Sequence, residues 1–119
     1  MPAADASVLD VGDVLWIDFG PPFGHEQASR RPAVVVTSRD YNSRSSLILV
    51  CPITRNPREW PFKVAIPPIG KLTGSVIVDQ VRAIDPAMRS FGPFGRVPDA
   101  VLVEIRSYLA ALLDIPRPS

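Results

Sequence analysis

Short apolar runs, broken repeatedly by proline and glycine, dominate the chain as far as residue 84. Alternating or β-branched patterns predict strands over Val11–Phe19, Pro32–Thr37, Leu47–Ile53, Phe62–Ile66, Gly74–Val78 and Val81–Ile84. In the first of these we expect Val14, Trp16 and Ile17 to face a core. The run Pro32–Thr37 is apolar enough to be buried on both faces, and Phe62 is expected in the core as well.

Polar or proline-rich segments connect these runs. Gly20–Gly24 opens a long loop, Ser38–Ser46 is a polar connection with one helical turn around Asp40–Asn42, and Thr54–Trp60 is polar and basic. Pro67–Gly70 predicts a turn, and Phe91–Gly95 predicts a loop.

The pattern changes to a helical period near the end of the chain. Pro98 is expected at the first helical position, Asp99 suits the helix dipole, and Pro116 ends the helix. One apolar face follows the helical spacing and consists of Val101, Leu102, Ile105, Tyr108, Leu109, Leu112 and Leu113.

Several short strands followed by one amphipathic helix predict a mainly β fold, a small barrel with a C-terminal helix. The fourteen prolines fit strand ends and turns better than a parallel α/β sheet. We expect one domain over residues 11–115, a loose tail at 1–10 and a short tail at 116–119.

Composition excludes several classes of protein and site. One cysteine, Cys51, cannot form an internal disulfide and is expected as a small core residue of a cytoplasmic protein. With a single His and a single Cys, a structural zinc site is excluded. We expect no membrane helix and no secretory signal, because the sequence has no apolar run near 18 residues and no basic start.

Charge is unevenly distributed along the chain. The formal charge is −5 over residues 1–29, +7 over residues 30–96 and −1 over residues 97–119. Nine of the eleven bases in the middle segment are Arg, whose planar fork suits phosphates. Individual charges can simply be solvated, but the basic middle favours an anionic partner, either nucleic acid or an acidic peptide.

Several motifs follow one another in a specific order. They are Gly12–Phe19, Gly24-His25-Glu26-Gln27, Arg31-Pro32-Ala33-Val34-Val35-Val36, Tyr41-Asn42, Pro52-Ile53-Thr54, Pro61-Phe62 and Asp79-Gln80-Val81-Arg82. Together with the closing helix, from Gly12 to about Ile115, this pattern resembles the MazF/PemK family of toxins from bacterial toxin–antitoxin systems. The resemblance implies an SH3-like (CcdB/PemK-type) barrel that acts as a homodimer.

The implied activity is sequence-specific, metal-independent cleavage of single-stranded RNA, chiefly mRNA, without a cofactor. The implied partner is a cognate antitoxin whose acidic, flexible tail occupies the RNA groove. The residues that the family pattern marks as a catalytic pair are Arg31 and Thr54 here. A PemK-like branch instead uses positions matching His25 and Asp79, together with an Arg where this chain has Ile77, so the Arg31/Thr54 version of the site is favoured.

Metal-free RNA cleavage uses the 2′-hydroxyl as nucleophile and leaves a 2′,3′-cyclic phosphate and a 5′-hydroxyl. It needs a base, a proton donor at the leaving oxygen and groups that stabilise the phosphate. Arg31 suits the phosphate because it stays charged, and Thr54 can hydrogen-bond a phosphoryl oxygen or simply cap a turn. His25 and Glu26 are alternative bases, although Glu26 and Gln27 can equally hold the loop by hydrogen bonds.

RNA binding is expected to use phosphate contacts and stacking on unpaired bases. The expected binding residues are Gln27, Arg30, Tyr41, Asn42, Arg55, Asp79, Gln80 and Arg82. The aromatic rings placed to stack are Phe23, Tyr41 and Phe94, while Trp60 can serve either the core or the RNA.

Two other functions remain as alternatives. One is a non-enzymatic barrel toxin of the CcdB type that inhibits DNA gyrase, and the other is a barrel module that holds RNA or a peptide without cutting. The Arg31/Thr54 pair and the Gly-His-Glu-Gln loop argue against the first.

Overall fold

Strand pairing organises the chain in this computed structural model, which describes residues 8–20 and 30–116. The antiparallel strands of the described residues are β1 (Asp13–Asp18), β2 (Arg30–Val35), β3 (Ile48–Thr54), β4 (Lys63–Ile69), β5 (Leu72–Ile77), β6 (Arg82–Ile84) and β7 (Ser90–Arg96). They pair in the order β4-β5-β3-β2-β1-β7, with β6 also paired to β3. The helical elements are α1 (Arg39–Arg44), the 3₁₀ helix η2 (Val78–Gln80), α2 (Pro86–Arg89) and α3 (Asp99–Leu112).

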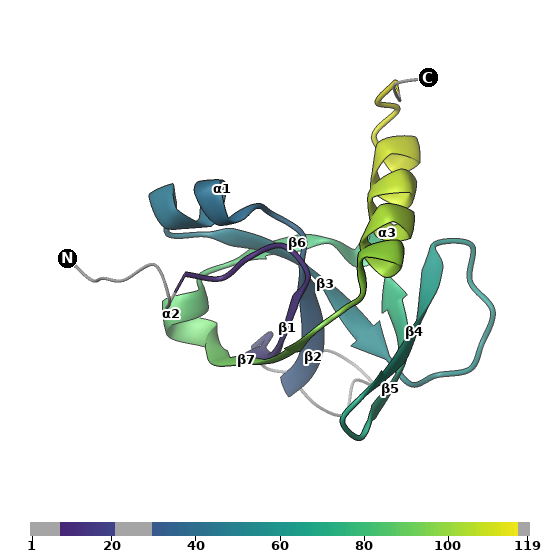
Figure 1. The fold of residues 1–119 in the computed structure, drawn as a ribbon, viewed down its shortest axis with the longest axis horizontal. Coiled ribbons are helices and arrows are strands. Elements are labelled where there is room, and N and C mark those ends of the chain that lie inside the picture. Colours follow the sequence, from purple (N-terminus) through teal and green to yellow (C-terminus); the bar gives the residue numbers. More distant parts are fainter. Residues whose placement is uncertain (1–7, 21–29, 117–119) are drawn as a thin grey trace.

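The sheet curls on itself, and α3 stands beside its β4–β5 side (Figure 1). The predicted mainly β barrel with a C-terminal helix is therefore confirmed, in the form of a curled half-barrel. No helix of the described residues is long and apolar enough to span a membrane.

Strand β3 has a partner along each edge. On one edge it pairs with β2, through Ala33↔Pro52 and Val35↔Val50. On the other edge it pairs with β6 near its beginning, where Arg82 lies opposite Val50, and with β5 at its end. The short helix η2 joins β5 to β6 and lies beside the middle of β3, where the Cys51 Sγ is 3.8 Å from the Val78 carbonyl oxygen.

The central strands are buried on both faces. Cys51 and Ile53 of β3 belong to one apolar cluster, together with Val34 of β2. Ile48 and Val50, which alternate with them along β3, belong to a second cluster. β2 likewise contributes Ala33 and Val35 to the second cluster, which confirms the two-faced burial predicted for this run.

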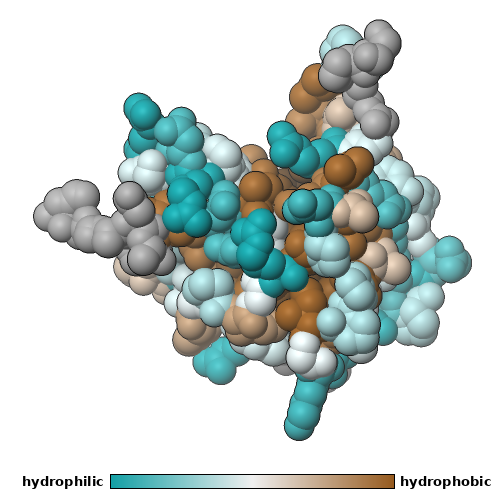
Figure 2. Space-filling view, viewed as in Figure 1, coloured by the Kyte–Doolittle hydropathy of each residue, from teal (hydrophilic) through white to brown (hydrophobic). Residues whose placement is uncertain are grey.

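Helix α3 closes the first cluster with its N-terminal half. Val101, Leu102 and Ile105 are buried there. Pro98 lies one position earlier than predicted, at the N-cap, and its carbonyl accepts the N–H of Val101. The last turn leaves the sheet, so Leu113 is 62% exposed, and apolar side chains lie on the projecting end of the helix (Figure 2).

Trp16 corrects one prediction about the core. It is 38% exposed instead of buried, and its ring stacks on Phe94 with centroids 6.0 Å apart. The physical reason is the position of α3, since Leu102 lies over Gly12 at the beginning of β1 while Trp16 lies farther along the strand. Phe62 is half-buried against the first cluster, where it meets Tyr108 edge-on with centroids 5.8 Å apart.

The predicted loop at Phe91–Gly95 is wrong, the predicted turn at Pro67–Gly70 begins later than expected, and one helix was not predicted. The segment predicted as a loop at Phe91–Gly95 is part of β7, an edge strand in which a proline costs no sheet hydrogen bond on the free side. Strand β4 continues through the prolines of the predicted turn to Ile69, and the turn follows at Gly70, with φ of +60°. Helix α2 was not predicted, although Asp85 caps it by accepting the Ala87 N–H at 3.0 Å.

Cys51 is in the core as predicted. Burial, followed by the negative charge of Asp79, raises the pKa of its thiol to about 12. Because the thiolate is the reactive form, we expect the native protein at pH 8 to react with a thiol-specific disulfide reagent at least about 100-fold more slowly than the unfolded protein.

The measurement is the rate of colour release at constant pH. The same protein in guanidinium chloride serves as the control and is expected to release one equivalent at the rate of a free cysteine. A native rate close to the unfolded rate would show that Cys51 is accessible and that the packing of η2 on β3 is wrong.

Candidate functional site

Thr54 is the last residue of β3, and it lies next to β5 and at the start of the connection between β3 and β4. Its hydroxyl oxygen accepts the Asn56 N–H at 3.1 Å, so the expected turn-capping role is present. Its backbone lies opposite Ser75 of β5, and the Thr54 carbonyl is in close contact with Gly74. Thr54 is half-buried, and by the alternation of side chains it lies on the face of β3 that also carries Ile48 and Val50.

Arg31 of β2 and Thr54 of β3 lie just beyond the paired part of the two strands. The antiparallel pairing ends at Ala33↔Pro52, and each of the two residues lies two positions beyond that pair, toward the same end of the sheet. Side chains alternate along each strand, so both residues fall on the face of the second cluster. Arg31 lies opposite the buried Ile17 on its other side and is half-buried itself. The two residues of the expected catalytic pair thus come from separate strands to one end of the sheet.

A cavity of about 170 Å³ opens next to Thr54. The connection between β3 and β4 forms one wall, and the end of β5 with η2 forms the other. The residues that line it include Thr54, Asn56, Trp60, Lys63, Ile77 and Gln80. A second hollow on the same connection extends to Arg55 and Ser75, so two of the expected binding residues, Gln80 and Arg55, flank Thr54.

Hydrogen bonds organise the connection between β3 and β4. The Lys63 ammonium group donates to the Asn56 carbonyl at 2.5 Å and to the Arg58 carbonyl. The Arg58 N–H donates to Asn56 Oδ1 at 3.0 Å. The indole N–H of Trp60 donates to both carboxylate oxygens of Asp79, at 3.0 and 3.2 Å. Trp60 is therefore a surface residue, 49% exposed, that bridges the two walls of the cavity.

Two further arginines of the expected binding set lie over aromatic rings. The Arg30 guanidinium is 4.4 Å from the centroid of Phe91, and the Arg82 guanidinium is 5.0 Å from the centroid of Phe19. Arg30, Phe91 and Trp16 line another hollow. The sequence analysis named Phe94 of this segment as a stacking ring but did not name Phe91, whose place beside Arg30 depends on the pairing of β7 with β1.

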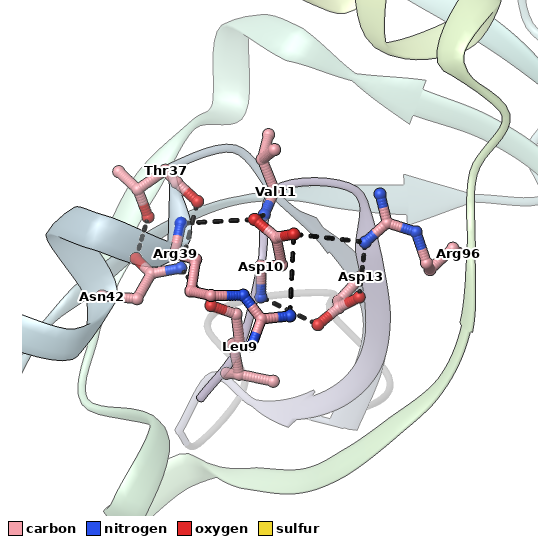
Figure 3. Close-up of polar contacts among 8 residues, drawn as sticks. All are labelled: Leu9, Asp10, Val11, Asp13, Thr37, Arg39, Asn42 and Arg96. Carbon is pink, nitrogen blue, oxygen red and sulfur yellow. Dashed lines mark hydrogen bonds and ion pairs between the residues drawn. The ribbon is translucent and has the colours of Figure 1, made fainter. Parts of the chain in front are cut away.

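Tyr41 and Asn42 do not lie near Thr54. They belong to α1, which leads into the beginning of β3, whereas Thr54 ends that strand, about 20 Å away at the usual rise per residue. Asn42 donates to the Leu9 and Thr37 carbonyls at 2.8 and 3.0 Å and accepts from the Thr37 hydroxyl at 2.6 Å (Figure 3). Its amide therefore holds α1 to the segment before β1.

A cluster of charged residues lies around the start of β1. Asp10 accepts the Arg39 N–H at 3.2 Å, and Arg96 of β7 reaches Asp10 at 3.9 Å and Asp13 at 3.0 Å (Figure 3). Arg39 and Arg96 are about half exposed, so these pairs contribute little individually. They tie the start of β1 to α1 and to β7.

Phe23, His25, Glu26 and Gln27 lie outside the described residues. Among the described residues, the site presents the charged groups of Arg30, Arg31, Arg55 and Arg82, a hydroxyl, an amide and exposed rings. Such a set can bind a polyanion and stack planar rings. Within the described ranges, no cluster of His, Cys, Asp or Glu has the arrangement of a metal site.

Comparison with known proteins identifies relatives over nearly the whole chain. Residues 10–113 match the family described as PemK-like, MazF-like toxin of type II toxin-antitoxin system. The Escherichia coli K12 endoribonuclease toxin MazF is 34% identical over 106 residues, which are 89% of this chain and 95% of that protein. The Escherichia coli endoribonuclease PemK is 32% identical over 111 residues, which are 90% of this chain and 84% of that protein.

Comparison with solved structures also identifies MazF proteins. MazF from Deinococcus radiodurans superposes with a TM-score of 0.80 at 36% identity, covering 90% of this chain and 97% of that one. A chain of a MazE–MazF complex from the same organism has a TM-score of 0.80 at 35% identity, covering 92% of this chain and 98% of that one.

The close approach of β5 to Thr54 is expected to require glycine at position 74. Gly74 has φ of +145°, and a Cβ there would overlap the Thr54 carbonyl oxygen. We expect Gly74→Ala to lower the free energy of unfolding by more than about 2 kcal/mol, because backbone strain and a steric clash add together. Chemical denaturation of both proteins measures this.

Gly70→Ala is the matched control. Gly70 also has positive φ, +60°, but a Cβ there meets no atom within 4 Å. It should therefore cost only the backbone strain, about 1–2 kcal/mol. Equal losses in the two variants would contradict the contact between Gly74 and Thr54.

Proposed function

The chain belongs to the PemK/MazF family of type II toxins, and we propose that it is an endoribonuclease that cuts single-stranded RNA, chiefly mRNA. The observation that supports this most is that Arg31 and Thr54 lie at the same end of two paired strands, each two residues beyond Ala33↔Pro52. Relatives that share about a third of the sequence are endoribonuclease toxins by name. We propose cleavage at a specific sequence, without a metal ion.

Arg31 and Thr54 act on the phosphate. The 2′-hydroxyl oxygen attacks phosphorus, the bond from phosphorus to the 5′-oxygen breaks, and a 2′,3′-cyclic phosphate and a 5′-hydroxyl result. A permanently charged guanidinium at Arg31 stabilises the negative charge that builds on the non-bridging oxygens, and it is too basic to take the proton. The Thr54 hydroxyl, which already accepts from Asn56, can donate its own proton to a phosphoryl oxygen.

Proton transfer needs two further roles. A base removes the proton of the 2′-hydroxyl, and a donor protonates the leaving 5′-oxygen, so that no net proton is consumed. His25 and Glu26, which precede β2 in the sequence, remain alternative candidates. His25 is the better match to neutral pH, because an unperturbed imidazole has a pKa of about 6.5.

We propose that the RNA and a neutralising antitoxin bind to the same surface of the protein. We propose that Gln27, Arg30, Arg55, Gln80 and Arg82 contact the RNA around the cut. A cognate antitoxin would neutralise the toxin by placing an acidic segment on these arginines, as is consistent with the solved MazE–MazF complexes of relatives. We also propose a homodimer.

The first test incubates the purified protein with a long single-stranded RNA in EDTA. We expect discrete fragments that carry 2′,3′-cyclic phosphate and 5′-hydroxyl ends, because the substrate supplies the nucleophile. The ends are identified by mass spectrometry. Intact RNA would contradict the proposal and favour either a gyrase inhibitor of the CcdB type or a binding module that does not cut.

The second test replaces Arg31 by Ala. Loss of the charge at the phosphate is expected to lower the cleavage rate about 10²–10³-fold, with little change in stability. Arg106→Ala, on the exposed side of α3, is the matched control and should cut like the wild type. A rate for Arg31→Ala near that of the control would mean that the site lies elsewhere.

A further inference from the structure

We propose that Trp60 and Asp79 form a positioning pair, which holds the connection between β3 and β4 against η2 and thereby fixes Thr54 and the shape of the cavity beside it. This inference rests on the proposed ribonuclease function. It assigns to Asp79 a structural task at the site and not the transfer of a proton.

The connection between β3 and β4 behaves as one hydrogen-bonded unit. The Lys63 ammonium group holds the carbonyls of Asn56 and Arg58, and Asn56 in turn accepts the Arg58 N–H. The Asn56 N–H donates to the Thr54 hydroxyl, which continues this unit into the end of β3. A displacement of the connection therefore moves the hydroxyl that the reaction uses.

The Trp60–Asp79 bond joins this unit to the opposite wall. Asp79 belongs to η2, which is held beside β3 where the Val78 carbonyl accepts from the Cys51 thiol at 3.8 Å. The indole N–H reaches both carboxylate oxygens, at 3.0 and 3.2 Å. A charged acceptor makes this hydrogen bond stronger than a neutral one. Trp60 lines one side of the cavity, and Gln80, the residue after Asp79, lines the other side.

The surroundings of Asp79 favour positioning over proton transfer. Its carboxylate is occupied by the indole N–H, and the residue two positions earlier is Ile77, whose side chain carries no charge and lines the cavity. Trp60 is 49% exposed and lines the cavity while its indole N–H is bound. The pair can thus hold the ring where an unpaired base of the RNA would stack.

Two consequences distinguish a positioning pair from a catalytic carboxylate. First, the role of Asp79 depends on accepting a hydrogen bond and not on its charge. A neutral acceptor at position 79 should therefore preserve much of the cleavage rate. Second, loosening the cavity should weaken discrimination between RNA sequences, since its shape then adapts to more bases.

The test compares Trp60→Phe, Asp79→Ala and Asp79→Asn on a cognate RNA and on an RNA with one base changed next to the cut. Trp60→Phe keeps a ring and removes the donor, and Asp79→Ala removes the acceptor. We expect each to lower kcat about 10-fold, with KM less affected, and to reduce the preference for the cognate RNA several-fold.

Asp79→Asn retains an oxygen that accepts the indole N–H, and it should recover most of the rate and the preference lost in Asp79→Ala. The double variant Trp60→Phe/Asp79→Ala should be no slower than either single variant, because both remove the same bond. The pH profile of kcat should keep its shape in Asp79→Asn. A loss in Asp79→Asn equal to that in Asp79→Ala, or a missing limb of the pH profile, would overturn the proposal.

Nuclear magnetic resonance gives a readout that does not depend on RNA cleavage. The chain has two Trp residues, and Trp60→Phe assigns their indole N–H signals. The Trp60 signal should move upfield in Asp79→Ala and much less in Asp79→Asn. An unshifted Trp60 signal in Asp79→Ala would overturn the proposed pair. A wild-type protein that cuts no RNA would overturn the ribonuclease function, but the hydrogen bond seen by this measurement would still stand.

Discussion

The ladder of hydrogen bonds along both edges of β3 is the interaction on which the rest of the structure depends. Its antiparallel pairing with β2 brings Arg31 and Thr54 to the same end of the two strands. Its pairing with β5 and β6 on the other edge holds η2, and with it Asp79, beside the same strand. A slip of one residue in either register would turn the site residues to the opposite face, because side chains alternate.

The core makes such a slip costly. Cys51 and Ile53 of β3 enter one apolar cluster and Ile48 and Val50 enter the other, so a slip of one residue would move each of these side chains to the opposite face. Each fully buried aliphatic side chain stabilises the fold by about 1.5–3 kcal/mol. The rigid scaffold therefore positions Thr54 and Arg31 at the sheet end, while side-chain hydrogen bonds shape the connection between β3 and β4, which carries no regular backbone pairing.

Local patterns predicted much of this fold. Alternation and β-branched runs located most strands, and the helical spacing located α3, because both depend mainly on which side chains must leave water. The edge strand β7 was missed because its Phe-Gly-Pro-Phe sequence has turn-forming residues that only an edge position tolerates. Trp16 was misplaced because its burial depends on how far α3 extends over the sheet. Arg31 and Thr54 were identified by family resemblance, and antiparallel pairing places them at the same end of β2 and β3.

The sequence by itself determined the class of fold, the two-faced burial of the run Pro32–Thr37 and the residues available for chemistry. Those properties follow from the order of apolar and polar side chains along one short stretch at a time. Only the tertiary structure decided that Asn42 holds α1 to the chain start, that Trp60 bonds to Asp79, and that Tyr41 lies at the far end of β3 from Thr54. These contacts and separations involve segments far apart in the chain, and their geometry depends on the packed sheet as a whole.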